Sequence, residues 1–209
     1  MLVPILSVLI LASAALHIRA EYAGPRMRVY VFKPLTTALI LVLAATAPAE
    51  EPAYRNAVLA GLAFSLLGDV FLMLPKDRFI PGLVSFLIAH VWYLVAFTAG
   101  TGFHTAVLPL IPYLVGGIAL MIVLWPHLGK MRGPVLIYAA VIVAMGWQAT
   151  ARWEGLGGTG PLLAALGATL FILSDAALAL NRFARPFPAA QALILATYYV
   201  AQWLIARSV

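Results

Sequence analysis

Two aspartates in strongly apolar surroundings are the residues of this sequence best suited to chemistry. Asp69 lies in "GDVFLML" and Asp175 in "SDAALALNRF". In both segments a small residue precedes the aspartate, leucine follows at the third and fifth positions, and Arg-Phe comes further along. Two carboxyl groups in one apolar pocket can divide the roles of proton donor and anion. Hydrolysis by general acid and base needs that arrangement, and we expect Asp69 and Asp175 to be catalytic.

A structural role is the alternative for these aspartates. Lys76 and Arg182 each follow their aspartate by two helical turns on the same face, so an ion pair could simply fix helix packing. Both aspartates lie at a similar depth, however, about 8 Å from the end of their segments at the rise of a helix. Ionisable groups inside a membrane usually face the bundle or a wet cavity. The matched depth therefore favours one shared site.

Other polar side chains within apolar segments are candidates for contacting a substrate. His90 shares a helical face with Tyr93, and Tyr198 or Tyr199 shares one with Gln202. The predicted substrate-binding residues are Lys33, His90, Tyr93, Tyr138, Ser174, Tyr198, Tyr199 and Gln202. The alternative is a set of hydrogen bonds between helices. Lys33-Pro34, at the predicted cytoplasmic start of its segment, is either a phosphate contact or a snorkelling lysine beside a first-turn proline.

The elements that position these residues are predicted to be membrane-spanning helices. Of the 209 residues, 64% are hydrophobic and 10% charged, and the mean hydropathy is +1.03. A soluble domain carries about 25% charged residues, so this chain has too few to cover a surface in water. Continuous apolar runs favour helices over a barrel. The eight segments run over residues 2–18, 31–48, 56–74, 79–98, 105–125, 133–150, 161–180 and 187–206.

Basic residues predict the orientation of these segments. The regions after the odd-numbered segments hold Arg19, Arg26, Arg28, Lys33, Lys76, Arg78, Lys130, Arg132, Arg182 and Arg185, and the opposite side holds Arg55, Arg152 and Arg207. Cytoplasmic loops carry the excess of Lys and Arg. We expect both termini in the periplasm and the aspartates near the cytoplasmic leaflet of a bacterial inner membrane. A cleaved signal peptide at segment 2–18 is the alternative there.

The organisation expected is an all-α bundle forming one transmembrane domain over residues 1–209. Tyr93 and Tyr199 are separated by the same number of residues as Asp69 and Asp175. This spacing suggests two four-helix halves related as parallel repeats.

Several kinds of site are disfavoured by the residues present. "GLGGTG" at 155–160 fits a dinucleotide-binding pattern, but it follows a membrane helix and not a strand. The four histidines lack the spacing of a zinc helix, and the sequence has no cysteine and no G-x-S-x-G motif. The net charge of +6 reflects loop lysines and arginines and not nucleic-acid binding. No metal or cofactor is expected.

Five stretches in series resemble the YhhN-like lysoplasmalogenase family: "KPLTT", "GDVFLML", "FLIAHVWY", "SDAALALNRF" and "TYYVAQ". The resemblance implies hydrolysis of the vinyl-ether bond of lysoplasmalogens to a fatty aldehyde and a glycerophospho-alcohol. It also implies roles for Asp69, Asp175, Lys33 and His90, and for the Tyr199–Gln202 pair. Acid cleaves vinyl ethers by protonating the β-carbon, which suits a carboxylic acid paired with a carboxylate.

Two other classes of function remain compatible with the sequence. A proton-coupled transporter or channel also carries paired intramembrane acids and repeats, and a lipid-binding membrane protein without turnover is the third reading. The partner expected is a lysophospholipid in the membrane. The sequence leaves open the lipid head group, which aspartate is the acid, the oligomeric state and any protein partner.

Overall fold

The structure is a computed structural model that describes residues 2–48 and 51–209. All regular structure in these two ranges is helical, as the apolar runs predicted. The helices are α1 (Leu2–Ala23), α2 (Arg26–Ala45), α3 (Pro52–Met73), α4 (Phe79–Thr98), α5 (Leu110–Leu124), α6 (Arg132–Leu156), α7 (Thr159–Ala179) and α8 (Ala190–Arg207). Two 3-10 turns, Trp125–His127 and Gly129–Met131, join α5 to α6, and a π-helical turn, Leu180–Ala184, extends α7.

Seven helices of the described chain are long and apolar enough to cross a bilayer, and α8 is the exception. Tyr198, Tyr199 and Gln202 lower the hydropathy of α8, and all three side chains are buried. α8 packs against α7 and α2, so its polar side chains face protein and not lipid. The chain is a polytopic helical membrane protein, as predicted.

The second helix begins earlier than the sequence suggested. The prediction that Lys33-Pro34 opens this segment is wrong, because α2 starts at Arg26, directly after the extended Pro25. Pro34 lies inside the helix, where a proline forgoes one backbone hydrogen bond. Arg26 and Arg28 occupy the first turn, and Lys33 is carried two turns into the bundle, where it is 9% exposed. Lys33 is therefore placed to meet Asp69 and not the surface.

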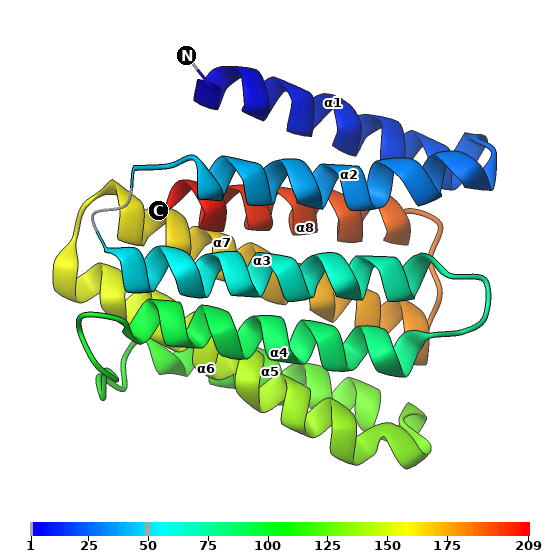
Figure 1. Ribbon diagram of the computed structural model, residues 1–209. Helices are drawn as coiled ribbons and strands as arrows, with labels where there is room; N and C mark the ends of the chain where they lie inside the picture. Colours follow the sequence, from blue (N-terminus) through cyan, green and yellow to red (C-terminus); the bar gives the residue numbers. More distant parts are fainter. Residues whose placement is uncertain (1, 49–50) are drawn as a thin grey trace.

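Helices that follow one another in the chain run in opposite directions, and the two termini lie at the same end of the bundle (Figure 1). The loops that follow α1, α3, α5 and α7 gather at the other end, where Asp69 and Asp175 lie near the last turns of α3 and α7. Glycines bring α3 close to α4: a Cβ atom on Gly61 would overlap the ring of Tyr93, and one on Gly68 would lie 2.6 Å from Phe86 Cε2. This close approach fixes the face of α3 that carries Asp69. Two expectations about the organisation of the chain, the two four-helix repeats and the single domain over residues 1–209, stay predictions.

Candidate active site

Asp69 lies at a point where three helices converge on one carboxylate. Its side chain is 2% exposed. Oδ2 accepts a 2.6 Å hydrogen bond from Thr37 of α2 and a 2.7 Å bond from Tyr198 of α8. The ammonium group of Lys33 lies 3.8 Å from Oδ1. Since two donors and one cation surround the group, the site is built to hold a carboxylate anion.

Asp175 has more apolar surroundings and fewer partners. Tyr138 of α6 donates a 2.5 Å hydrogen bond to its Oδ2, and Nε2 of His90 lies 3.8 Å from the same oxygen. The His90 ring is fully buried and packs edge-on against Tyr138 and Phe171. The second carboxyl oxygen of Asp175 is thus left available to a bound molecule.

Both aspartates line one polar cavity of about 450 Å³ at the end of the bundle where the α3–α4 and α7–α8 loops meet. Ser174 also lines it, with its hydroxyl donating to the Ile194 carbonyl. The charged side chains around this cavity are Glu21, Arg26, Lys33, Asp77, Arg78 and Arg182. This set of mixed charge could bind a zwitterionic group. In the part of the chain that the structure describes, no group of three or more His, Cys, Asp and Glu side chains is placed to hold a metal ion.

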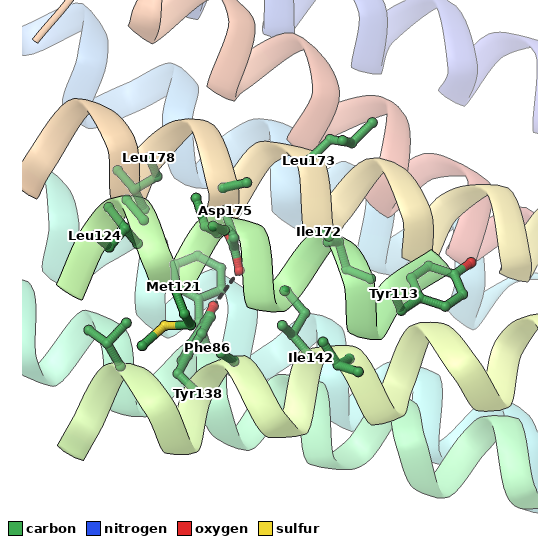
Figure 2. A pocket seen from close by; sticks show the side chains of 18 of the residues that line it. Phe86, Tyr113, Met121, Leu124, Tyr138, Ile142, Ile172, Leu173, Asp175 and Leu178 are labelled. Atoms are coloured by element: carbon green, nitrogen blue, oxygen red, sulfur yellow. Dashed lines mark hydrogen bonds between the residues drawn. The ribbon is translucent and has the colours of Figure 1, made fainter. Parts of the chain in front are cut away.

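A second, mainly apolar cavity of about 310 Å³ lies between α4, α5, α6 and α7. Figure 2 shows Tyr138 and Asp175 joined across it, with Leu124 and Leu178 at one end and Tyr113 at the other. The Tyr113 hydroxyl is hydrogen-bonded to Thr150 and Thr169, at 2.6 Å and 2.8 Å. The residues that line both cavities are Leu72, Phe79, Phe86, Asp175 and Leu178. Asp175 is therefore the carboxyl group at the junction of the polar and apolar spaces.

The predicted site residues separate into those that line these cavities and those behind them. Lys33, Asp69, Tyr138, Ser174, Asp175 and Tyr198 line one or both cavities. Tyr93 instead donates a 2.6 Å hydrogen bond to Gln202 Oε1, and both side chains are fully buried outside the cavity linings. His90 likewise touches the site through Asp175. Tyr93 and Gln202 are therefore placed to support the site from behind and not to contact a substrate directly.

Tyr199 belongs to a separate pair that the sequence reasoning missed. Its hydroxyl lies 2.7 Å from Nδ1 of the fully buried His17, whose Nε2 is 3.4 Å from Glu21. The sequence does carry a signal, because His17 and Glu21 are one helical turn apart. The contact between Thr37 and Asp69 was also not predicted, although Thr37 follows Lys33 by one turn on the same face of α2.

An ion pair at the mouth of the polar cavity was also not anticipated. Arg182 donates a 2.6 Å hydrogen bond to Asp77 of the α3–α4 loop and lies over the Phe79 ring. That hydrogen bond holds the pKa of Asp77 below its ordinary value. The sequence suggested Asp175 as a partner for Arg182, but the π-helical turn after α7 directs the arginine to Asp77.

Comparison of the sequence with known proteins finds relatives in one family. A family model described as "YhhN family" matches residues 28–209. The chain is 36% identical over 198 residues to the "Uncharacterized membrane protein YhhN" of Escherichia coli O157:H7, with 94% of each chain covered. It is 38% identical over 167 residues to "Lysoplasmalogenase TMEM86A" of Homo sapiens, covering 72% of this chain and 64% of that protein. Similar identity, 38% over 165 residues, relates it to "Lysoplasmalogenase TMEM86B" of Homo sapiens, covering 74% of this chain and 64% of that protein. No solved structure matches the chain.

Proposed function

Because this chain belongs to the YhhN family, we propose that it is an integral membrane hydrolase that cleaves the vinyl-ether bond of lysoplasmalogens. The relatives named lysoplasmalogenase support an enzyme of this type. The observation that carries the proposal is the position of Asp175, which lies in the lining of both the polar and the apolar cavity. A lysolipid has a polar and an apolar part joined at the bond to be cleaved.

The two cavities match the two parts of such a lipid. The apolar cavity accepts the alkenyl chain, which runs from Asp175 past Ile142 and Ile172 toward Tyr113. The polar cavity accepts the glycerophospho head group, with Arg78 as a contact for its phosphate. Arg26 and Arg182 also line this cavity, but they are paired with Glu21 and Asp77. The vinyl-ether carbons then lie at the junction. In this placement the β-carbon is on the chain side and the α-carbon on the head-group side.

The reaction follows from this placement. The Asp175 carboxyl group donates its proton to the β-carbon, and the carbon–carbon double bond becomes an oxocarbenium ion at the α-carbon. Water adds to the α-carbon and loses a proton to Asp69. The resulting hemiacetal breaks its bond to the glycerol oxygen, which takes the proton held by Asp69. The hemiacetal hydroxyl gives its proton to Asp175 and becomes the aldehyde carbonyl, so both carboxyl groups return to their starting states. The products are a fatty aldehyde and a glycerophospho-alcohol, and the water supplies the added oxygen and hydrogens.

The surrounding residues support this division of roles. Thr37, Tyr198 and Lys33 hold Asp69 as an acceptor, which suits an anion that stabilises the cation and activates water. Tyr138 fixes one oxygen of Asp175 and leaves the other to carry the proton toward the substrate. Lys33 acts first on Asp69 and only second as a contact for the phosphate.

The proposed orientation puts both termini in the periplasm and the polar cavity at the cytoplasmic leaflet, with residues 1–209 as one membrane domain. The excess of basic residues at the loops after α1, α3, α5 and α7 supports this orientation. Labelling of single cysteines, Lys76→Cys and Glu154→Cys, tests it in intact cells. We expect Lys76→Cys to be protected from an impermeant periplasmic reagent and Glu154→Cys to react, and the reverse result would overturn the orientation.

The activity itself is tested with purified protein in detergent, where transport across a membrane cannot occur. The substrate is 1-alkenyl lysophosphatidylethanolamine, and the matched control is the 1-alkyl ether, which has no double bond to protonate. We expect aldehyde release from the alkenyl lipid alone. No release from alkenyl lysolipids of any head group would contradict the proposed function.

A further inference from the structure

The helix α5 differs from the rest of the bundle in how little of it is buried. Leu124, at its end, is the one buried residue of Leu110–Leu124. α5 lies at the edge of the bundle beside α6 (Figure 1). A groove of about 550 Å³ runs along the outer side of this helix pair, lined by residues such as Leu114, Ile118, Ile122, Leu136 and Ala140. Its lining is almost wholly apolar, as expected of a surface in contact with lipid chains.

This outer groove and the inner apolar cavity share one wall. Gly117 and Met121 of α5, with Ala139 and Val143 of α6, line both spaces. Two of these four residues have little or no side chain. A Cβ atom on Gly117 would lie 3.1 Å from Val143 Cγ2, so α5 and α6 approach each other closely at this point. The cavity ending at Asp175 is thus separated from the outer groove by one layer of residues, two of which are small.

From this shared wall we infer that the alkyl chain of the substrate binds first in the outer groove and passes between α5 and α6 into the inner cavity. The inference rests on the proposed function, because it takes a lysolipid as the occupant. The polar and apolar cavities meet at residues that include Asp175, Phe79 and Phe86. A long chain that entered through the polar cavity would therefore pass charged side chains before it reached the apolar one. A chain that arrives from the bilayer stays in apolar surroundings throughout.

A disulfide across the shared wall tests this route. The sequence has no cysteine, so the double variant Gly117→Cys with Val143→Cys has no other thiol within the chain to pair with. A Cβ atom at residue 117 would lie 3.1 Å from Val143 Cγ2, which is the basis for choosing this pair. The probes are long-chain and short-chain 1-alkenyl lysophosphatidylethanolamine in detergent. On oxidation we expect the ratio of long-chain to short-chain turnover to fall at least tenfold and to return on reduction.

The control disulfide joins α1 and α2 through Ser13→Cys and Thr36→Cys, whose native hydroxyl oxygens are 2.7 Å apart in the protein interior. Its oxidation should leave the ratio unchanged. Complete cross-linking of the 117–143 pair with an unchanged ratio would overturn the inference, and so would an equal loss with both chain lengths. If wild-type protein releases no aldehyde from either lipid, the proposed function fails instead.

A second variant keeps the test informative if the double variant does not fold. Ala140→Trp fills the outer groove from an exposed position, and Ala12→Trp makes the same change on the exposed face of α1. We expect Ala140→Trp to raise KM for the long-chain lipid about tenfold or more and Ala12→Trp to leave it unchanged. Equal KM values in the two variants would contradict access through the groove.

Discussion

The Tyr198 hydroxyl in α8 donates a hydrogen bond of 2.7 Å to Oδ2 of Asp69 in α3. Thr37 in α2 donates to the same oxygen at 2.6 Å. One carboxylate oxygen therefore joins the consecutive helices α2 and α3 to α8, which is far from both in the sequence. The same contacts pack α2, α3 and α8 together and orient Asp69. Because the Thr37 bond and the Tyr198 ring remain when only the Tyr198 hydroxyl is removed, that change should affect turnover more than folding.

Tyr198→Phe keeps the ring and removes the hydroxyl group that holds Asp69. A hydrogen bond to a charged group contributes about 1.5–3 kcal/mol, so we expect kcat to fall about 10- to 100-fold, at roughly 1.4 kcal/mol per tenfold change. The measurement is aldehyde release at saturating lysolipid. Tyr54→Phe is the matched control, because Tyr54 bonds Ser208 at the other end of the bundle. Equal kcat values for the two variants would show that Tyr198 does not act on Asp69.

His90→Phe separates the chemistry of the His90 ring from its packing. Both ring nitrogens are buried without a hydrogen-bond partner among the described residues. An unsatisfied buried polar group costs about 1–3 kcal/mol, so the apparent melting temperature of His90→Phe should stay level or rise. Turnover should fall, but less than in Asp175→Asn, because Nε2 faces Asp175 without reaching the substrate. The exposed His127→Phe should change neither quantity, and wild-type turnover in His90→Phe would remove His90 from the site.

Gly61→Ala tests the close approach of α3 and α4. Its Cβ atom would overlap Tyr93, which is fully buried and held by Gln202. Overpacking of a tight interior costs about 1–3 kcal/mol, so we expect a lower melting temperature in thermal unfolding followed by fluorescence. Gly133→Ala is the control, since a Cβ atom there meets nothing within 4 Å. Equal melting temperatures would mean that Tyr93 can move aside.

The fold could largely be predicted from the sequence because each apolar run has the length of a membrane span. The start of α2 could not, because Lys33 and Pro34 are typical of a helix start and only the packing of α2 against α3 draws them inside. α8 was predicted as a span on length, although its polar residues serve the interior of the bundle.

The candidate site was predicted best where a motif carried a charge. Asp69 and Asp175 stand out in apolar sequence, and the structure brings both to one cavity. The sequence did not show whether Tyr198 or Tyr199 lies at the site. The two are adjacent in α8, and only the packing of this helix directs Tyr198 to Asp69 and Tyr199 to His17. The Asp77–Arg182 pair was not predicted. Arg182 lies in the π-helical turn after α7, and no residue pattern in the sequence predicts that turn.

In the proposed mechanism Asp175 donates the proton and Asp69 serves as the anion, and kcat of their asparagine variants measures both contributions. An amide keeps the shape of the side chain but supplies neither the acid nor the anion, and general acid–base groups contribute about 10²–10⁴-fold. We expect Asp175→Asn and Asp69→Asn each to lose at least about 10²-fold in aldehyde release. The double variant should be little worse than either single one, because the two groups act as a unit. Glu154→Gln, at the exposed end of α6, should retain wild-type turnover, and all variants should remain folded. A folded Asp175→Asn enzyme that releases aldehyde at the wild-type rate would show that Asp175 is not the proton donor.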